Sequence, residues 1–157
     1  MPVIQALKSC PLFTGYPEPG LLMIAKIARN RPVTAQTPIV VENMVAESMY
    51  IVKNGIVQLS VRAMDGRDIV LEQLAPGEFF GEMSLLIGGH RMVTATAKTD
   101  CELIEIMRRD FIKLQNQKPQ ACFKLVISII NQFSKKLTGC REYLKTLMVA
   151  GFSGIDT

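Results

Sequence analysis

The residues best suited to chemistry lie together in the segment 76–97, PGEFFGEMSLLIGGHRMVTATA. It contains a Gly81-Glu82 pair, a short apolar run, a second glycine pair at 88–89 and a single arginine, Arg91. Backbone N–H groups and one guanidinium can hold a phosphate diester, while a carboxylate can accept a sugar hydroxyl. The segment therefore carries the groups needed to bind a ligand with one phosphate and one sugar.

A simpler interpretation uses the same residues. Gly81, Gly88 and Gly89 can serve only as turn residues, and Arg91 can form an ion pair with Glu82 without any ligand. An isolated Gly-Glu…Arg pattern favours this simpler interpretation, because short motifs carry little information by themselves. The elements on either side must therefore decide between the two.

The first part of the chain is predicted to be helical. A short turn over 2–7 precedes a helix over 18–28, and Pro17 and Pro19 mark the start of that helix. From about Arg31 to Met107 the pattern changes to short strands separated by turn residues. The chain is therefore expected to pass from a helical segment into a β-structure.

Two hairpins are predicted within this β-region. The expected strands are 48–52, 56–61 continuing to 63, 68–74, 92–97 and 102–106. Asn54-Gly55 joins the first two runs, and this dipeptide is the strongest short-range hairpin signal. Asp65-Gly66 joins the next two, and Pro76-Gly77 forms a further turn. Strands at this spacing predict a small antiparallel barrel or jelly roll.

Two helices are predicted to follow the strands. The first covers 109–115, and the second begins at Pro119 and could reach Leu147. Apolar residues recur along it at alternating steps of three and four: Phe123, Val126, Ile130, Phe133, Leu137, Cys140, Leu144 and Leu147. Such a stripe is found on a helix packed against its own domain, but its regularity favours a partner helix.

The chain resembles the cyclic-nucleotide-binding domains. Phe80-Gly81-Glu82-Met83-Ser84-Leu85 is similar to the first half of that family's phosphate-binding segment, and Arg91 lies at the expected distance. The resemblance runs from about Leu12 to Leu144, and Pro11-Leu12-Phe13, Gly55 and Asp65-Gly66-Arg67 also fit it. It implies a mainly β fold with flanking helices: an antiparallel β-roll (jelly roll) with N-terminal helices and a long C-terminal helix.

This resemblance implies one domain over 1–150, divided into N-terminal helices (1–30), a β-roll (31–107) and C-terminal helices (108–148). The remaining residues, 151–157, are expected to form a flexible tail. In the family the long helix both dimerises and closes over the base. A homodimer through 123–147 is therefore expected, with Thr138, Tyr143 or Leu144 near the purine.

The resemblance also implies roles for individual residues. The implied ligand-binding residues are Phe80, Gly81, Glu82, Met83, Ser84, Leu85, Arg91, Met92 and Val93. Arg91 would bind the phosphate and Glu82 the ribose 2'-hydroxyl. Ser84 and Leu85 would supply N–H groups at the start of a short helix, Gly81 would allow close approach, and Val93 would bring an amide from the far side.

Two positions depart from the family pattern. Met92 follows the arginine where the family usually has Ala, Ser or Thr, and His90 precedes it. A hydroxyl after the arginine would favour guanine, and Met92 offers none, while its bulk could crowd the phosphate. These residues therefore favour cyclic AMP over cyclic GMP, but they do not decide between the two nucleotides.

Size and composition indicate one folded domain. The chain has 157 residues, 48% of them hydrophobic and 20% charged, with a net charge of +4. This mild basicity is compatible with nucleic acid or an anionic ligand and demonstrates neither. The basic pairs Arg108-Arg109 and Lys135-Lys136 are interpreted as solvated helix faces.

Cysteine and histidine usage excludes some classes of site. The four cysteines are widely separated and His90 is the one histidine, so neither a zinc site nor a cupin-like metalloenzyme is expected. A Ser-His-Asp set could use only His90, and nothing else in the sequence indicates a cofactor or an enzyme activity. Without a signal peptide or a bilayer-spanning apolar run, the chain is expected in a reducing cytoplasm.

Two functions follow as hypotheses. The first is a cyclic-nucleotide sensor that signals through its C-terminal helix to a partner or dimer mate. The alternative is a degenerate roll that serves as a nucleotide-independent dimerisation or docking module. The chain ends at Thr157, too early for the DNA-binding domain that many bacterial relatives carry, so DNA binding is not expected from it. It is either a stand-alone sensor or a fragment of a regulator, channel or kinase.

Overall fold

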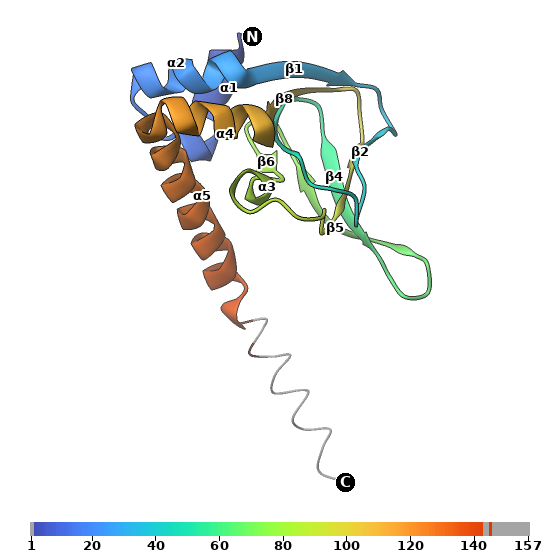
Figure 1. The fold of residues 1–157 in the computed structure, drawn as a ribbon. Coiled ribbons are helices and arrows are strands. Elements are labelled where there is room, and N and C mark those ends of the chain that lie inside the picture. The colour runs from blue at the N-terminus through green and yellow to red at the C-terminus, as the bar shows by residue number, and fades with distance from the viewer. Residues whose placement is uncertain (1, 143–144, 146–157) are drawn as a thin grey trace.

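The computed structural model describes residues 2–142 and Lys145 (Figure 1). Helices gather at one end of the molecule and the strands form its other part. The N-terminal helices are α1 (Val3–Ser9), the short 3-10 helix η1 (Pro11–Phe13) and α2 (Glu18–Ile27). After the strands, α4 (Arg108–Gln117) packs beside α2, and α5 (Pro119–Gly139) extends away from the body.

Within the described residues, eight strands form two four-stranded antiparallel sheets. The first has the order β1-β8-β3-β6 and the second β2-β7-β4-β5. The strands are β1 (Ala28–Val33), β2 (Pro38–Val40), β3 (Ser48–Asn54), β4 (Val57–Arg62), β5 (Asp68–Leu74), β6 (Phe79–Phe80), β7 (Thr94–Ala97) and β8 (Cys101–Met107). This double-sheet architecture confirms the predicted β-roll with flanking helices.

The hairpin predicted at Asn54-Gly55 is wrong. β3 and β4 flank this turn, but β3 pairs with β6 and β8 in one sheet, whereas β4 pairs with β5 and β7 in the other. The chain crosses between sheets here, and Gly55 has a positive φ of 87°. A Cβ at Gly55 would lie 2.4 Å from the carbonyl oxygen of Asp100. The glycine therefore allows the β3–β4 connection to pass close to the backbone just before β8, in addition to turning the chain.

The second predicted hairpin is confirmed. β4 and β5 pair antiparallel from Val57 opposite Leu74 to Arg62 opposite Asp68. The connection closes with a hydrogen bond from the Ala63 N–H to the Arg67 carbonyl. This loop projects from the body of the molecule (Figure 1).

Two apolar cores meet at β3, which is buried on both faces. Met49 and Ile51 belong to a core that the helices share with the first sheet, while Tyr50 and Val52 belong to the core between the sheets. Successive side chains of a strand point to opposite faces, so this one strand contributes to both cores. It thereby links the helical end to the roll.

α5 has one buried face and one exposed face. Cys122, Leu125 and Ile129 are buried against the helical core. The exposed large apolar residues on the helix are Phe123, Ile127, Ile130, Phe133 and Leu137. Most of the predicted stripe thus faces away from the domain, although Val126 packs partly against the core. Its last members, Leu144 and Leu147, lie outside the described residues.

The helices of the described part show no candidate for crossing a membrane, because none combines sufficient length with sufficient apolarity.

Candidate ligand pocket

A cavity of about 240 Å³ lies between the segment after β6 and the loop before β7. Its lining residues are Val40, Ala46, Phe80, Gly81, Glu82, Met83, Ser84, Ile87, Gly88, His90, Arg91, Met92 and Val93. Every residue expected to bind the ligand lines it except Leu85, which is buried in the helical core instead. The fold therefore brings both ends of the predicted segment to one hollow.

Arg91 supplies the guanidinium that lines this cavity. Its side chain is almost fully buried, with a residue exposure of 7%, and its Nη2 donates to the carbonyl oxygen of Ser48 at 2.7 Å. Its Nε is buried and has no hydrogen-bond partner. In the described part of the chain, no carboxylate lies within ion-pair distance of Arg91. The predicted alternative, an ion pair between Arg91 and Glu82, is therefore not formed.

Burial lowers the pKa of the Arg91 guanidinium below its ordinary value. Glu105 and Glu47 lie near enough to oppose that shift, although neither touches it. The group stays charged at neutral pH, because guanidinium pKa values in proteins remain far above 7. A buried cation with an unused donor and no counter-ion is costly, and an anion in the cavity would satisfy it.

A polar network beneath the cavity positions Arg91. The Ser48 carbonyl also accepts a hydrogen bond from the Ser84 hydroxyl at 2.9 Å, so one carbonyl anchors both sides of the cavity. The Arg91 guanidinium carbon lies 5.8 Å from the centre of the Tyr50 ring, which stacks on Phe80 at 5.0 Å. This places the cation over an aromatic face, a favourable position for it.

The hydroxyl end of Tyr50 is held by an ion pair. Its hydroxyl donates to Glu105 Oε1 at 2.8 Å and accepts from Arg31 Nη1 at 2.7 Å. Arg31 and Glu105 also pair directly at 3.1 Å. Burial raises the pKa of Tyr50, so the phenol remains protonated as the donor in this network. The ring is thus fixed at both ends beneath Arg91.

Gly81 is required for this packing. It has a positive φ of 73°, and a Cβ built there would lie 2.4 Å from Arg91 Nη1. The same Cβ would lie 3.0 Å from the Ser48 carbonyl oxygen that Arg91 binds. The sequence predicted close approach at Gly81, and here the approaching group is the guanidinium itself.

The short helix α3 (Met83–Leu86) follows, with Glu82 at its N-cap position. The two N–H groups expected to meet a phosphate are engaged within the turn: that of Ser84 donates to Gly81 O and that of Leu85 to Glu82 O, both at 3.1 Å. These N–H groups can donate to a ligand only if they break these hydrogen bonds or divide the donor between two acceptors. The Arg91 guanidinium is therefore the main donor available to an anion in this arrangement.

Glu82 contacts the long helix. Its side chain is 12% exposed, and its Oε1 lies 3.9 Å from Nζ of Lys136 on α5. The Lys136 ammonium also lies 5.2 Å from the centre of the Phe79 ring. Lys135 and Lys136 are both exposed, as the interpretation of a solvated helix face expects, and Lys136 in addition contacts Glu82. This lysine connects α5 to the carboxylate expected to bind a sugar.

The loop that follows β2 closes the cavity from the other side. The Arg91 N–H donates to Met44 O at 2.7 Å, and the Asn43 N–H donates to Arg91 O at 2.8 Å. Met92, expected to crowd the phosphate, has a side chain directed largely to solvent, with an exposure of 85%. His90 is exposed and forms an isolated bridge with Val45. Neither departure from the family pattern fills the cavity.

No group of three or more His, Cys, Asp and Glu side chains able to hold a metal ion occurs among the residues that the structure describes.

The sequence alone missed Ser48, Tyr50, Glu105 and Lys136 as parts of this site. Ser48, Tyr50 and Lys136 each contact a predicted residue from a distant part of the chain, and Glu105 holds Tyr50 in place. A run such as SMYIV, buried on both faces, shows no alternation that would single out its serine and tyrosine. The one available signal was the presence of two polar side chains inside a predicted core strand.

The sequence of this chain is similar to those of known proteins. The sequence profile described as "Cyclic nucleotide-binding domain" matches residues 30–118. The cyclic AMP receptor protein of Thermus thermophilus is 32% identical over 119 residues, which are 76% of this chain and 55% of that protein.

Solved structures agree. The catabolite activator protein of Thermus thermophilus has a TM-score of 0.78 at 28% identity, covering 88% of this chain and 63% of its own. The regulatory domain of Toxoplasma gondii PKA, crystallised with cAMP, has a TM-score of 0.65 at 29% identity, covering 71% of this chain and 42% of its own.

The chain spans about half the length of the bacterial regulators it matches. The matched region begins within β1 and contains the other seven strands, the Gly81-Glu82 pair and Arg91. Profile, sequence identity and fold therefore agree, and the chain belongs to the family of cyclic nucleotide-binding domains.

Proposed function

We propose that this domain is a regulatory sensor that binds a cyclic nucleotide, with cyclic AMP as the preferred ligand. The observation that carries the proposal is the buried, unpaired Arg91 guanidinium in a preformed cavity. A cyclic phosphate diester has one negative charge, which would neutralise this cation and give its unused donor an acceptor.

Glu82 supports a nucleotide rather than a simple anion. It lies on the rim of the same cavity, where its carboxylate could accept a ribose hydroxyl while Arg91 holds the phosphate. The relatives named above are a cyclic AMP receptor protein and a PKA regulatory domain solved with cAMP, which favours cyclic AMP. Met92 offers no hydroxyl to guanine, which points the same way.

α5 supports a role in signalling. One of its faces packs on the core beside the cavity, Lys136 contacts Glu82, and its other face exposes apolar side chains. A ligand that changes the environment of Glu82 would shift the balance between arrangements of this helix. The domain would then act on a dimer mate or partner by binding, without catalysis of its own. Its four unpaired cysteines fit a reducing, cytoplasmic setting.

Calorimetric titration tests the proposal. The purified chain, checked for co-purified nucleotide, should bind cyclic AMP more tightly than cyclic GMP. Arg91→Ala should weaken binding about 100-fold or more, because it removes a buried charge from a charged hydrogen-bonded pair. Arg67→Ala is the matched control, since Arg67 is an exposed loop residue paired with Asp65.

Two results would contradict this function. The first is that Arg91→Ala, still folded, binds the nucleotide as tightly as the wild type. The second is that the folded wild type binds neither nucleotide. The second result would favour the alternative of a nucleotide-independent dimerisation or docking module, for which the exposed apolar stripe on α5 is the specific support.

A further inference from the structure

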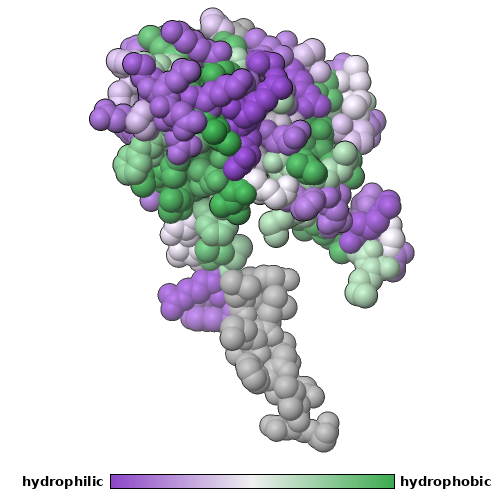
Figure 2. All heavy atoms as spheres, viewed as in Figure 1, coloured by the Kyte–Doolittle hydropathy of each residue, from purple (hydrophilic) through white to green (hydrophobic). Residues whose placement is uncertain are grey.

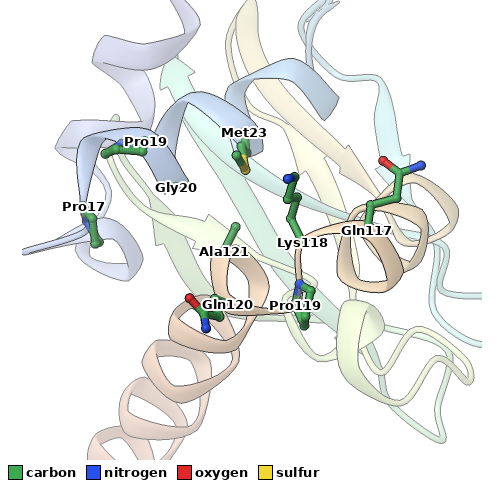
Figure 3. Close-up of a pocket in the computed structure, with 9 residues that line it drawn as sticks. All are labelled: Pro17, Pro19, Gly20, Met23, Gln117, Lys118, Pro119, Gln120 and Ala121. Atoms are coloured by element: carbon green, nitrogen blue, oxygen red, sulfur yellow. The ribbon is translucent and has the colours of Figure 1, made fainter.

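A long groove lies on the helical end of the molecule, apart from the cavity around Arg91. Two hollows of about 460 and 360 Å³ share the lining residues Met23, Gln117 and Lys118, so they lie side by side along α2. One wall is α2, and the other is the end of α4 with the start of α5 (Figure 3). The groove is therefore long enough for several residues of an extended chain rather than for one small molecule.

The walls of the groove are held together by the fold. The Tyr16 hydroxyl, just before α2, donates to the carbonyl of Ala121 in the first turn of α5. Lys124 on α5 also donates to the carbonyl of Gly15. Pro17, Pro19 and Pro119 fix the backbone on both sides. Little conformational entropy would be lost when this surface binds a partner.

The middle of the groove is apolar. Met23 projects into it from α2 and faces the Lys118-Pro119 junction (Figure 3). Ile27 and Leu114 line its continuation toward the other hollow. Methionine is flexible and polarisable, which suits a surface that accepts a partner side chain. This arrangement would receive one aliphatic or aromatic anchor.

The rim of the groove is basic. Lys26, Lys113 and Lys118 line it and are exposed. Across the described residues, none of these three lysines has a carboxylate within ion-pair distance. The acid that lines the groove, Asp110, is already paired with Arg29 at 3.1 Å and Arg109 at 3.7 Å. Figure 2, drawn in the view of Figure 1, shows hydrophilic residues over much of this helical end.

We propose that this groove docks an acidic peptide segment of a partner protein. An apolar side chain of the segment would sit over Met23 and Pro119, and its Asp and Glu side chains would face Lys26, Lys113 and Lys118. Charge complementarity sets the class of partner, and the concave apolar floor distinguishes a peptide from a flat anionic surface. The proposal does not depend on nucleotide binding.

Selection from a random-peptide phage library, with nucleotide-free protein, provides the test. Enriched peptides should combine clustered acidic residues with one apolar residue. A synthetic copy of such a peptide should shift the amide NMR signals of α2 and of the α4–α5 junction. The double variant K113E/K118E should bind it at least about tenfold more weakly, and higher salt should weaken wild-type binding.

The matched control is Lys135→Glu, an exposed lysine outside the groove that should leave peptide affinity unchanged. Met23→Gln tests the apolar floor and should weaken binding without altering the charge. The proposal is overturned if enriched peptides show no acidic bias, or if K113E/K118E binds them as well as the wild type. Lysine-dependent binding to vesicles of phosphatidylserine and phosphatidylcholine, with no peptide binding, would also overturn it.

Discussion

At the scale of single residues, the pocket depends on the contacts that Arg91 makes with Ser48 and Tyr50, which are distant in the sequence. Arg91 can lie over Tyr50 and donate to Ser48 because Gly81 has no side chain in its path. Gly81 thus has two functions, a left-handed turn and a space for the guanidinium. A substitution at Gly81 therefore tests whether this contact is needed for ligand binding, independently of whether the domain folds.

Gly81→Ala should lose nucleotide affinity while the domain stays folded. The new methyl group would collide with Arg91 Nη1, and the positive φ would add about 1–2 kcal/mol of strain. Calorimetry should show binding weakened at least about tenfold, because Arg91 must leave its position. Gly66→Ala is the control: it has a comparable φ of 83° but nothing within 4 Å. Equal affinities of the two variants would disprove the role of Gly81.

Cys10 should make stability depend on pH in the alkaline range. Burial, chiefly, raises the pKa of this thiol from 9.0 to about 12, with a smaller contribution from nearby Glu82. Above pH 9 the unfolded chain loses the thiol proton while the folded chain keeps it. The unfolding free energy should therefore be fully retained below that pH and fall by up to about 1.4 kcal/mol per pH unit above it.

Urea unfolding between about pH 8 and 10 would measure this slope. Cys10→Ala should reduce the slope, whatever its constant cost in packing, and leave the part contributed by Cys122, whose pKa is also raised by burial. Cys140→Ala, which removes an exposed thiol, is the control variant. An identical slope in Cys10→Ala and the wild type would show that Cys10 is not its origin.

At the scale of elements, local signals predicted the parts of the fold that are local. The β4–β5 hairpin is set by Asp65-Gly66 and its flanking strands, and the buried and exposed faces of α5 follow from apolar spacing. The turn at Asn54-Gly55 carried an equally strong signal, but β3 and β4 find their partners elsewhere. Which strands pair is decided by burying both faces of β3, a long-range effect that a dipeptide does not encode.

The same division applies to the candidate site. The residue types and spacing of Gly81, Glu82 and Arg91 predicted a shared hollow, and the cavity contains all three. The partners Ser48 and Lys136 come from β3 and α5, which only the tertiary fold brings to this point. Sequence therefore identified the groups that would touch a ligand better than the groups that hold them in place.

Lys136→Ala should uncouple α5 from the pocket. The ammonium of Lys136 lies 3.9 Å from the Glu82 carboxylate and attracts it toward the helix. Without it, Glu82 is free for the ligand, and cyclic AMP affinity should rise about two- to fivefold, as expected for a partly exposed ion pair. Hydrogen exchange on α5 should then respond less to ligand than in the wild type.

Lys135→Ala is the matched control for this variant, because it removes a neighbouring exposed lysine from the same helix. It should keep wild-type affinity and the wild-type exchange response. If both variants behave alike, the contact between Lys136 and Glu82 plays no part in coupling.

At the scale of the whole molecule, the two faces of α5 have different surroundings. Its buried face is satisfied by the helical core, whereas its exposed face keeps a row of apolar side chains in contact with water. Monomeric soluble proteins rarely leave such a row uncovered. A second copy of the same helix is the simplest partner, because a symmetric pair covers both rows at once.

Light scattering should therefore find a dimer that the double variant I130E/F133E converts to a monomer. Both residues are exposed on α5, so the charges should break a helix–helix seam while the roll keeps its melting temperature within a few degrees. Met64→Glu is the control, because it places the same charge on an exposed apolar residue of the β4–β5 loop. It should remain dimeric. A wild type that stays monomeric at all concentrations would assign this face to a different partner, and a dimeric I130E/F133E would move the interface away from α5.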